Sequence, residues 1–543
     1  MLGGMQGTNL TVSLLLEGME RQFGHKHVAT ATSEGSQVTT YAEIANRIRK
    51  LVGGLRNLGL QDGDRVATFG WNSQRHLELY VAVPAAGLVL HTINHRLYGA
   101  QIDYILQHAD DRAVFVDASL LPIVWPHIRE ANRIAHVIVM PDAIGSPEVN
   151  GDPRVKHYET FLERSQPVGG DLFTGDEKTA AGLCYTSGTT GDPKGVLYDH
   201  RSIMLHALTS LAVDNLAITE TDVVMPIVPM FHANAWGLPY AAVMVGADIA
   251  MPGNMTSPEA LAAQLEQSEV TIAAAVATVW RSVLPHLRNR SLPHIRRIMS
   301  GGGPLPLSLS TEYEAAVGTP LSSSWGMTEM SPVGAIARLS SGHVTLSAED
   351  QRNVLILPGI SPPLVRMRLT TSDGMQAPWD GETPGELEVA GPTVAGGYYN
   401  NDDHAAFTPD GWLRTGDIAT IDPLGYLRIV DRAKDLVKSG GEWISSAELE
   451  NEIMAHPLVQ EAAVIGVPDE RWEERPLACV VVRPNALIDS DDIKDFLLDR
   501  VAKWWIPEEI VFVADIPKTA TGKFSKLALR QQFIRPRVNG PRS

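Results

Sequence analysis

The stretch YTSGTTGDPKG, residues 185–195, constrains the local fold of this chain more strongly than any other part of its sequence. Gly188, Gly191 and Gly195 allow the backbone to turn sharply and to approach a ligand closely. Backbone N–H groups in such a turn form a concave site for anions, and hydroxyl and ammonium groups add donors. We therefore interpret this stretch as a polyphosphate-binding loop, with donors from Thr186, Ser187, Gly188, Thr189, Thr190 and Lys194.

Two other interpretations of the loop are weaker. Pro193 stands where the Walker A pattern requires a glycine directly before its lysine, so the chain does not match a P-loop NTPase. A plain surface turn would need neither the lysine nor this density of hydroxyl groups.

Length and charge narrow the class of protein. A chain of 543 residues, of which 44% are apolar, is too long for one ordinary domain. The formal net charge of -18, without a cluster of Lys and Arg, argues against a surface built to bind nucleic acid. Cys184 and Cys479 lie far apart, and their spacing fits neither a disulfide framework nor a structural zinc site. These features predict a cytoplasmic protein.

The sequence predicts no membrane anchor. The segment LTVSLLLEGMERQF, residues 10–23, has too short an apolar core for a signal peptide and is typical of an amphipathic first helix. This helix could pair two copies of the chain in a homodimer, or it could pack on its own domain. The longest apolar run, LYVAVPAAGLVL, is about half of the ~20 residues that a membrane span needs, and it contains Pro84.

The alternation of apolar runs and helical patterns predicts a mixed α/β fold. The helical pattern EIANRIRKLVGGLRNLG, residues 43–59, has apolar residues three or four positions apart. The strand-like runs are RVATFGW, RAVFVD, HVIVMP, VVMPIV, TIAAAVATVW and RRIMSGG.

A domain boundary is predicted within GYLRIVDRAKDLVKSGGEW, residues 425–443. There a strand-like run ends in charged residues and a glycine pair, and the helical pattern SSAELENEIMAHP follows. A small C-terminal domain of about 110 residues therefore begins there, which is within the usual size range. It ends near PKTATGKFSK, a polar turn that presents a lysine.

Ordered motifs along nearly the whole chain resemble those of acyl-CoA synthetases in the adenylate-forming superfamily, which includes firefly luciferase and peptide-synthetase adenylation domains. The motifs are YTSGTTGDPKGV (185–196), SSSWGMTE (322–329), GWLRTGD (411–417), DRAKDLVKSGGEWIS (431–445) and PKTATGK (517–523). VPMFHANAWGLPY, KSGGEWISSAELE and AKWWIP most resemble bacterial medium- and long-chain fatty acyl-CoA ligases and methylthiopropionate-CoA ligases. The resemblance implies a large N-terminal adenylation domain with mixed sheets, residues 1–431, and a small mobile C-terminal α+β domain, residues 432–543. The hinge would lie at residues 431–435.

The resemblance also implies a reaction and its cofactors. A carboxylic acid and ATP would give acyl-AMP and pyrophosphate, and coenzyme A would then give acyl-CoA and AMP. Lys523 would bridge the acid and the α-phosphate, where negative charge accumulates. Glu329, with Thr186 and Thr328 beside it, would hold Mg2+, which binds through few carboxylates and through substrate phosphates.

The same resemblance assigns the nucleoside contacts. Asp417 would accept hydrogen bonds from the ribose hydroxyls, and Arg432 would contact the ribose as well. The adenine would lie against the glycines of GGGP and close to Trp325. The residues in this group are Gly302, Gly303, Pro304, Trp325, Gly326, Met327, Thr328, Asp417 and Arg432.

The acyl pocket is also implied by resemblance. His232 would lie beside the carboxylate of the acid, and Trp236 would gate the acyl tunnel. Val276, Ala277 and Thr278, together with Gly302, would line the cavity. Related enzymes often carry Gly-Val-Pro where this chain has AVAT, which leaves the bore of the tunnel undetermined. We interpret the other histidines, including His91 and His95, as structural.

The second half-reaction requires the small domain to rotate, because the Lys523 loop would occupy the path of the CoA thiol. Lys434 matches the superfamily hinge, and the segment after it would line the CoA channel. That segment contributes Lys438, Gly440, Gly441, Glu442 and Trp443.

Three functions remain open from the sequence. The first is a fatty acyl-CoA ligase for medium- or long-chain acids. The second is the same acid–thiol ligase acting on a short thio- or aryl-alkanoate such as methylthiopropionate. The third, less favoured, is a carrier-loading or non-catalytic adenylation module.

Overall fold

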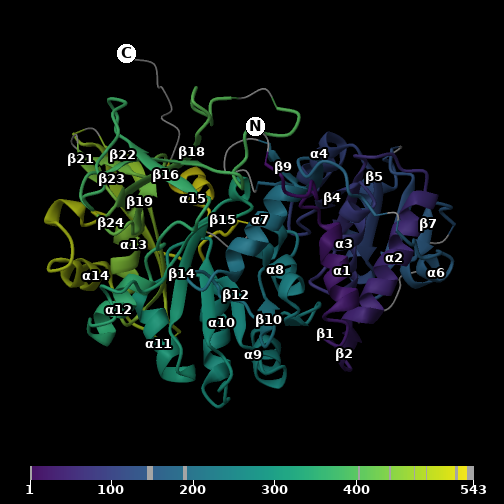
Figure 1. The fold of residues 1–543 in the computed structure, drawn as a ribbon. Helices are drawn as coiled ribbons and strands as arrows, with labels where there is room; N and C mark the ends of the chain where they lie inside the picture. The colour runs from purple at the N-terminus through teal and green to yellow at the C-terminus, as the bar shows by residue number, and fades with distance from the viewer. Residues whose placement is uncertain are drawn as a thin grey trace.

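The computed structural model describes residues 3–131, 133–142, 151–170, 172–186, 192–401, 404–439, 442–469, 471–484, 486–519 and 524–534. Two mostly parallel sheets, one antiparallel sheet and a C-terminal sheet organise this part of the chain (Figure 1). The mixed α/β class predicted from the sequence is confirmed.

The first sheet carries the predicted phosphate loop at one edge. Its order is β7 (Val155–His157), β6 (His136–Met140), β5 (Asp111–Asp117), β3 (Arg65–Phe69), β4 (Val89–Thr92), β8 (Ala180–Tyr185) and β9 (Gly195–Asp199). The strands are parallel except for β9, which runs antiparallel to β8, with Tyr185 opposite Gly195. The loop residues 186–194 therefore connect two paired strands.

The second sheet lies beside the first and contributes part of the wall of the predicted acyl site. Its order is β15 (Val333–Ile336), β14 (Leu321–Gly326), β13 (Arg297–Gly301), β12 (Ile272–Val276), β10 (Val223–Pro226), β11 (Asp248–Met251), β1 (His27–Thr32) and β2 (Gly35–Thr40). The central strands are parallel, and both edges end in antiparallel pairs.

Helices between and outside the two sheets complete a layered core. The largest apolar cluster joins residues of both sheets to α1 (Ser13–Arg21), α2 (Tyr41–Asn57), α3 (Gln74–Ala85), α7 (His200–Leu211) and α8 (Leu238–Val245). The outer face of the first sheet is covered by α4 (Gly99–Ala109) and α5 (Leu121–Ile128), and α6 (Tyr158–Glu163) packs near its edge. The outer face of the second sheet is covered by α9 (Pro258–Gln267), α10 (Ala277–Leu287) and α11 (Leu307–Val317). Helix α12 (Ala348–Leu355) contacts α11 and β14.

Helix α2 confirms the helical pattern predicted for residues 43–59. Thr40 caps its start, because the Thr40 hydroxyl accepts from the Glu43 N–H while the Glu43 carboxylate accepts from the Thr40 N–H. Ile44, Ile48 and Leu51 lie on one face and are fully buried. The 3.6-residue period of apolar residues therefore predicted the buried face of this helix correctly.

The run TIAAAVATVW is only partly a strand, which corrects the sequence interpretation. The strand β12 ends at Val276, and α10 begins at Ala277. Trp280 belongs to the helix and donates its indole N–H to the Met299 carbonyl at 2.8 Å. Apolar continuity could not reveal the change of period, because both elements are buried on this face.

The N-terminal amphipathic segment packs on its own domain. Helix α1 contacts α2, α3 and α8, and Leu15, Leu16 and Met19 are at most 3% exposed. The same apolar residues therefore do not offer a surface for a second copy. No helix among the described residues is both long and apolar enough to span a membrane.

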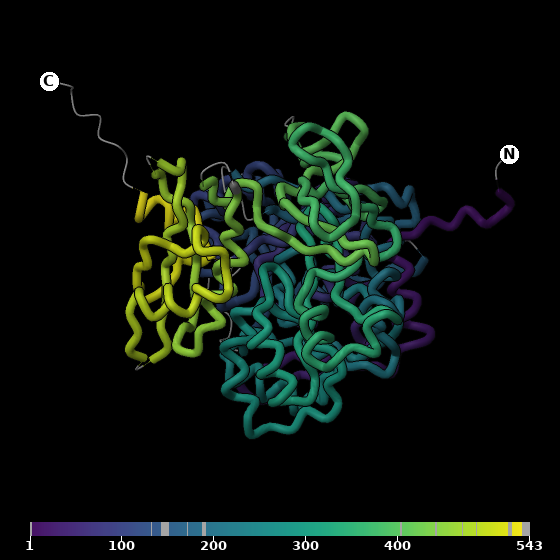
Figure 2. Tube along the Cα trace, turned by 90° about the vertical axis from the view of Figure 1, so that its left-hand side faces the viewer, coloured from purple at the N-terminus to yellow at the C-terminus, as the bar shows by residue number. Residues whose placement is uncertain are grey.

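The chain continues into an antiparallel sheet and a C-terminal sheet. The third sheet has the order β16 (Arg366–Thr370), β17 (Gly385–Ala390), β18 (Leu413–Ile421) and β19 (Leu427–Arg432). The fourth has the order β21 (Glu442–Ile444), β20 (Val437–Ser439), β23 (Glu473–Val482) and β22 (Val459–Asp469), with β24 (Glu509–Phe512) paired to β23. Figure 2 shows this last sheet to one side of the large layers.

The C-terminal sheet carries α13 (Ser446–Met454), α14 (Ser490–Leu497) and α15 (Lys526–Phe533). Short turns of 3-10 helix cover Ala118–Leu120 (η1), Ala233–Gly237 (η2), Thr328–Met330 (η3) and Lys503–Trp505 (η4). Cys184 in β8 and Cys479 in β23 are both buried and free, as the spacing predicted.

Candidate active site

Two hydrogen bonds between Thr186 and Lys194 hold the two ends of the phosphate loop together. The Thr186 N–H donates to the Lys194 carbonyl at 2.9 Å, and the Lys194 N–H donates to the Thr186 hydroxyl at 3.2 Å. Ser187, Gly188, Thr189 and Thr190 lie outside the described residues, so their predicted roles stay predictions.

Tyr398 connects Lys194 to Glu329. The Lys194 ammonium lies 4.7 Å from the centre of the Tyr398 ring, and the Tyr398 hydroxyl donates to Glu329 Oε1 at 2.8 Å. Glu329 is 6% exposed. The backbone holds the same segments together, since the Tyr399 N–H donates to the Gly195 carbonyl at 2.8 Å and the Ala395 N–H donates to the Glu329 carbonyl. Two motifs far apart in sequence thus meet through a tyrosine.

The Trp-Gly-Met-Thr-Glu motif is anchored to the strand after the phosphate loop. The Tyr198 hydroxyl in β9 donates to the Thr328 carbonyl at 2.6 Å. Gly326 has no room for a side chain, because a Cβ there would lie 2.0 Å from the Pro332 carbonyl oxygen. The Met327 N–H donates to the same carbonyl at 3.0 Å.

The predicted ribose residues form a second connected group. The Asp417 carboxylate, 2% exposed, accepts the Trp325 indole N–H at 2.9 Å and pairs with the Arg432 guanidinium at 2.7 Å. Arg432 also donates to the Thr415 carbonyl at 3.1 Å. The structure therefore brings together Trp325, Asp417 and Arg432. Trp325 touches Asp417 by its indole N–H, a contact that the sequence analysis did not predict.

The glycine segment after β13 meets the predicted gate residue. A Cβ at Gly301 would lie 2.7 Å from the Trp236 ring, whereas a Cβ at Gly303 would meet nothing within 4 Å. Gly302 has a φ of 81°, in the left-handed region that favours glycine. The segment therefore keeps one open face at Gly303, and Pro304 follows it.

Trp236 belongs to a left-handed turn between β10 and α8. Ala233, Asn234, Ala235 and Trp236 have φ values between 43° and 57°, and Gly237 follows at 73°. Left-handed backbone costs roughly 1–2 kcal/mol for each non-glycine residue, so the surroundings must hold this turn in place. The Cys184 thiol donates to the Asn234 side-chain oxygen at 3.4 Å, which connects the turn to the strand that leads into the phosphate loop.

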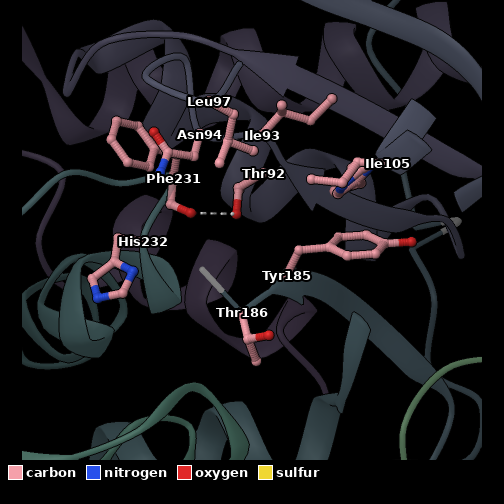
Figure 3. Close-up of a pocket in the computed structure, with 10 residues that line it drawn as sticks. Thr92, Ile93, Asn94, Leu97, Ile105, Tyr185, Thr186, Phe231 and His232 are labelled. Carbon is pink, nitrogen blue, oxygen red and sulfur yellow. Dashed lines mark hydrogen bonds between the residues drawn. The ribbon is translucent and has the colours of Figure 1, made fainter. Parts of the chain in front are cut away.

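His232 lies at the junction of two cavities. Figure 3 shows it across a small cavity from Thr186 and Tyr185, with Phe231 and Asn94 on the same side. It also lines a larger and mostly apolar cavity of about 130 Å³, together with Val276. Ala277, Thr278 and Trp236 are not among the residues that line this larger cavity.

His95 lines the apolar cavity, and its interpretation as a structural residue stays a prediction. Its ring packs against Trp71 at 4.5 Å and against Phe231 at 4.7 Å between ring centres. Burial lowers the pKa of His95 to about 3, so the ring is neutral near pH 7. His91 instead forms a buried pair with Asp111 at 2.9 Å, which is consistent with a structural role.

The described residues of the predicted hinge and CoA channel are not among those that line the acyl cavity. The Lys434 carbonyl accepts from Arg530 at 3.2 Å, and burial lowers the pKa of the Lys434 side chain. The Lys438 ammonium lies 4.9 Å from the centre of the Trp443 ring, and the two residues are register partners in β20 and β21. Gly440, Gly441, Lys523 and the side chain of Glu442 lie outside the described residues.

The donors around Glu329 fit a magnesium ion. Within the described residues no three His, Cys, Asp or Glu side chains gather to hold a metal. Glu329 is a single buried carboxylate beside the phosphate loop, which suits Mg2+ because this ion takes most of its ligands from phosphates and water.

Sequence reasoning missed Tyr398, Trp71 and the wall formed by His95. Tyr398 lies in GGYYNNDD, where no spacing distinguishes it from a loop residue. Trp71 lies two residues after the end of β3, and this position just past a parallel strand was the available signal.

Comparison with known proteins identifies related sequences along nearly the whole chain. The model of the AMP-binding enzyme family matches residues 19–399, and the model of the AMP-binding enzyme C-terminal domain matches residues 448–523. A long-chain-fatty-acid–CoA ligase of Thermus thermophilus is 43% identical over 534 residues, covering 97% of this chain and 96% of that protein. A 3-methylmercaptopropionyl-CoA ligase of Ruegeria pomeroyi is 42% identical over 540 residues, covering 98% and 99%.

Solved structures share the fold. The crystal structure of ATP-bound MatB from Rhodopseudomonas palustris superimposes with a TM-score of 0.82 at 27% identity, covering 97% of this chain and 99% of that one.

Proposed function

The chain belongs to the family of AMP-binding enzymes and is an AMP-forming acyl-CoA ligase that uses ATP, Mg2+ and coenzyme A, and we propose that it activates an apolar monocarboxylic acid at His232. In the first step a carboxylate oxygen attacks the α-phosphorus, and the bond to pyrophosphate breaks. In the second step the CoA sulfur attacks the acyl carbonyl, its proton is lost, and AMP leaves. The observation that carries the proposal is that His232 borders both the phosphate-loop cavity and the apolar cavity.

The phosphate loop and Glu329 would prepare ATP for attack. Lys194 is held over the Tyr398 ring, so its ammonium stays near the loop and can lie beside phosphate oxygens. Glu329 and Thr186 would hold the metal ion, whose positive charge offsets the charge on the phosphates when it is bound. Because Tyr398 donates to Glu329, the carboxylate has one fixed orientation.

The nucleoside would rest on the Trp325, Asp417 and Arg432 group. Asp417 already holds Trp325 and Arg432, so its carboxylate is fixed where ribose hydroxyls can donate to it. The open face at Gly303 leaves space for a planar base beside Gly302 and Pro304.

Rotation of the C-terminal part about Lys434 would serve the second step. Lys523 would act in adenylation, and Lys438, Gly440, Gly441, Glu442 and Trp443 would line the path of CoA. We place the domain boundary at residues 431–432, at the end of β19 and before β20. The Asp431 carboxylate accepts from the Ser446 N–H at 2.6 Å, so the two sides of this boundary are in contact.

Acids of two size classes are candidate substrates. Resemblance around Trp236 favours medium- or long-chain fatty acids, and a relative named as a long-chain ligase supports them. A short thio- or aryl-alkanoate is the alternative, supported by a relative named for 3-methylmercaptopropionyl-CoA. We further propose a cytoplasmic protein, and a homodimer formed through surfaces other than the buried face of α1.

The test of the proposed function is pyrophosphate release by the purified chain with Mg2+, ATP and a panel of acids, with and without CoA. We expect acid-dependent release of pyrophosphate and CoA-dependent formation of thioester. Lys523→Ala should slow adenylation by ~10²–10³-fold, as the loss of one positioned charge at a transition state does. It should leave thioester formation from supplied acyl-adenylate near the wild-type rate. No acid-dependent AMP formation with any acid would contradict the function.

A further inference from the structure

The segment that contains Lys523 leaves and rejoins the C-terminal sheet at a fixed base. Lys518 and Phe524 face each other in an isolated antiparallel bridge, and the Ser525 N–H donates to the Pro517 carbonyl at 2.7 Å. The Ser525 side chain also caps the start of α15. Because a peptide bond joins Lys523 to Phe524, the contacts that hold this base also constrain the position of the Lys523 backbone.

A buried ion pair holds the side of this base that continues into α15. The Lys526 ammonium, in the first turn of α15, lies 2.8 Å from Glu450 Oε1 and donates to the Ser446 hydroxyl at 2.6 Å. The side chains of Lys526 and Glu450 are only 13% and 8% exposed. Glu450 also accepts from the Val464 N–H at 2.7 Å. One charged centre therefore joins α15 to α13 and β22.

Ser446 extends this contact across the proposed domain boundary. Its N–H donates to the Asp431 carboxylate at 2.6 Å, and its hydroxyl donates to the same carboxylate oxygen. Asp431 belongs to β19 and is 3% exposed. A chain of hydrogen bonds thus runs from Lys526 through Ser446 to β19.

Stability alone does not explain a charged pair at this position. Removal of two charges from water is costly, and replacement of a buried ion pair by apolar side chains is often neutral or stabilising. The pair instead contributes geometry. One ammonium is shared between the oxygens of Glu450 and Ser446, so the first turn of α15 has one position relative to α13.

We propose that Lys526 is a positioning residue for adenylation, which fixes the base of the Lys523 segment against α13 and β19 so that the Lys523 ammonium can reach the α-phosphate. The inference rests on the proposed function and adds a residue that acts through Lys523. Lys523 is assigned to adenylation alone, so the loss of Lys526 should spare thioester formation.

The experiment replaces both members of the pair, because Lys526→Met alone would leave a buried carboxylate without its cation. In Lys526→Met/Glu450→Met we expect acid-dependent pyrophosphate release to fall ~10–100-fold, because a misplacement of about 1 Å at a reacting group costs up to about 10²-fold. Formation of acyl-CoA from supplied acyl-adenylate should stay near the wild-type rate. A purely structural role would lower both half-reactions in the same proportion.

Two further variants complete the test. Lys526→Arg keeps a cationic donor to both oxygens and should restore most of the adenylation rate. Arg500→Met/Glu452→Met is the matched control, since Arg500 pairs with Glu452 of the same helix α13 at 2.8 Å and lies outside α15. This control should leave both half-reactions unchanged.

Amide hydrogen exchange of peptides that cover residues 517–530 separates this inference from the proposed function. We expect exchange about tenfold faster in Lys526→Met/Glu450→Met than in the wild type or the control, because local opening governs exchange. If no acid releases pyrophosphate from the wild type, the proposed function fails, while this faster exchange would still support the fixing of the base by Lys526. Unchanged exchange, or an equal loss of both half-reactions, would overturn the positioning role.

Discussion

A single tyrosine joins the two motifs that would handle the phosphates. Tyr398 supports Lys194 with its ring and Glu329 with its hydroxyl, so the two contacts can be separated by substitution. A hydrogen bond to a charged group contributes about 1.5–3 kcal/mol. The ring of a phenylalanine would keep the contact to Lys194 and lose the bond to Glu329.

We therefore expect Tyr398→Phe to lower kcat/KM for pyrophosphate release about tenfold, ~1.4 kcal/mol, and to raise the Mg2+ concentration needed for half-maximal activity. Tyr399→Phe is the control, because Tyr399 contacts the phosphate-loop strand through its backbone. Equal activity of Tyr398→Phe and the wild type at limiting Mg2+ would exclude this role for the hydroxyl.

Asp117 makes stability depend on pH. Burial raises the pKa of Asp117 to about 8, although the Trp71 N–H partly opposes this rise. The folded chain therefore keeps a proton that the unfolded chain loses above pH 4, and stability falls as pH rises towards 8. Below pH 6.5 the buried neutral His76 acts in the opposite direction, because burial lowers its pKa to about 4.

Above pH 6.5 the Asp117 contribution remains, with a slope of up to ~1.4 kcal/mol per pH unit until pH 8. Asp117→Asn should remove this slope, because an amide does not titrate and its oxygen can still accept from Trp71. Melting temperatures from pH 6.5 to 8.5 test this expectation. A parallel decline in wild type and variant would mean that Asp117 is already ionised in the folded chain.

At the scale of elements, the sequence predicted periodic features better than strained ones. The stripe of Ile44, Ile48 and Leu51 identified α2 because a helix of period 3.6 was the only pattern that buried it. The order of the motifs identified the site segments. No sequence pattern indicated the left-handed turn at Ala233–Gly237, because alanine and tryptophan seldom adopt that backbone and tertiary contacts hold it.

The dependence on tertiary contacts also explains two other features that the sequence did not predict. Val276 and Ala277 differ little in hydrophobicity, so the strand-to-helix change between them depended on packing that the sequence does not display. His95 acquires its place in the cavity from Trp71 and Phe231, which are distant in sequence. Contacts between residues that are distant in sequence depend on the whole fold, so the spacing of residues within one segment does not predict them.

Gly237 provides a test of the turn. Its φ is 73°, and a Cβ there would lie 2.4 Å from the His206 ring. Gly318, at the end of α11, has a similar φ of 79° with nothing within 4 Å of a Cβ. Each Gly→Ala substitution places an alanine in left-handed backbone, which costs roughly 1–2 kcal/mol of stability. Only Gly237→Ala also brings a methyl group against the His206 ring.

We expect Gly318→Ala to lower the free energy of unfolding by about 1 kcal/mol with unchanged kcat/KM. Gly237→Ala should lose more stability and at least tenfold in kcat/KM, because the turn carries Trp236 and follows His232 directly. Denaturant unfolding and pyrophosphate release measure the two effects. Identical behaviour of the two variants would show that the turn has no influence on the site.

At the scale of the whole molecule, the segment after β19 connects the large layers to the C-terminal sheet. Arg530 in α15 holds it from the C-terminal side through Asp435 at 2.8 Å and the Lys434 carbonyl. Asp431 holds it from the other side through Ser446. The proposed rotation about Lys434 would require its backbone dihedrals to change while these contacts rearrange.

Lys434→Pro should therefore suppress thioester formation at least tenfold more than adenylation, because proline fixes φ. Lys434→Ala keeps a flexible backbone and should behave like the wild type in both half-reactions. Separate measurements of pyrophosphate release and of acyl-CoA formation decide between them. An equal loss of both activities in Lys434→Pro would contradict a hinge at this position.

The two native thiols have a practical consequence for observing such a movement. Cys184 and Cys479 are sealed inside strands, and burial raises their pKa values to about 11 and about 12, so neither forms a reactive thiolate near neutral pH. A dye that reacts with thiols would thus label only cysteines introduced at the surface, for example at Val344 and Leu487, which are 64% and 95% exposed. Energy transfer between dyes at these two positions would show whether the C-terminal part moves during a single turnover, and the two native cysteines would not need to be replaced first.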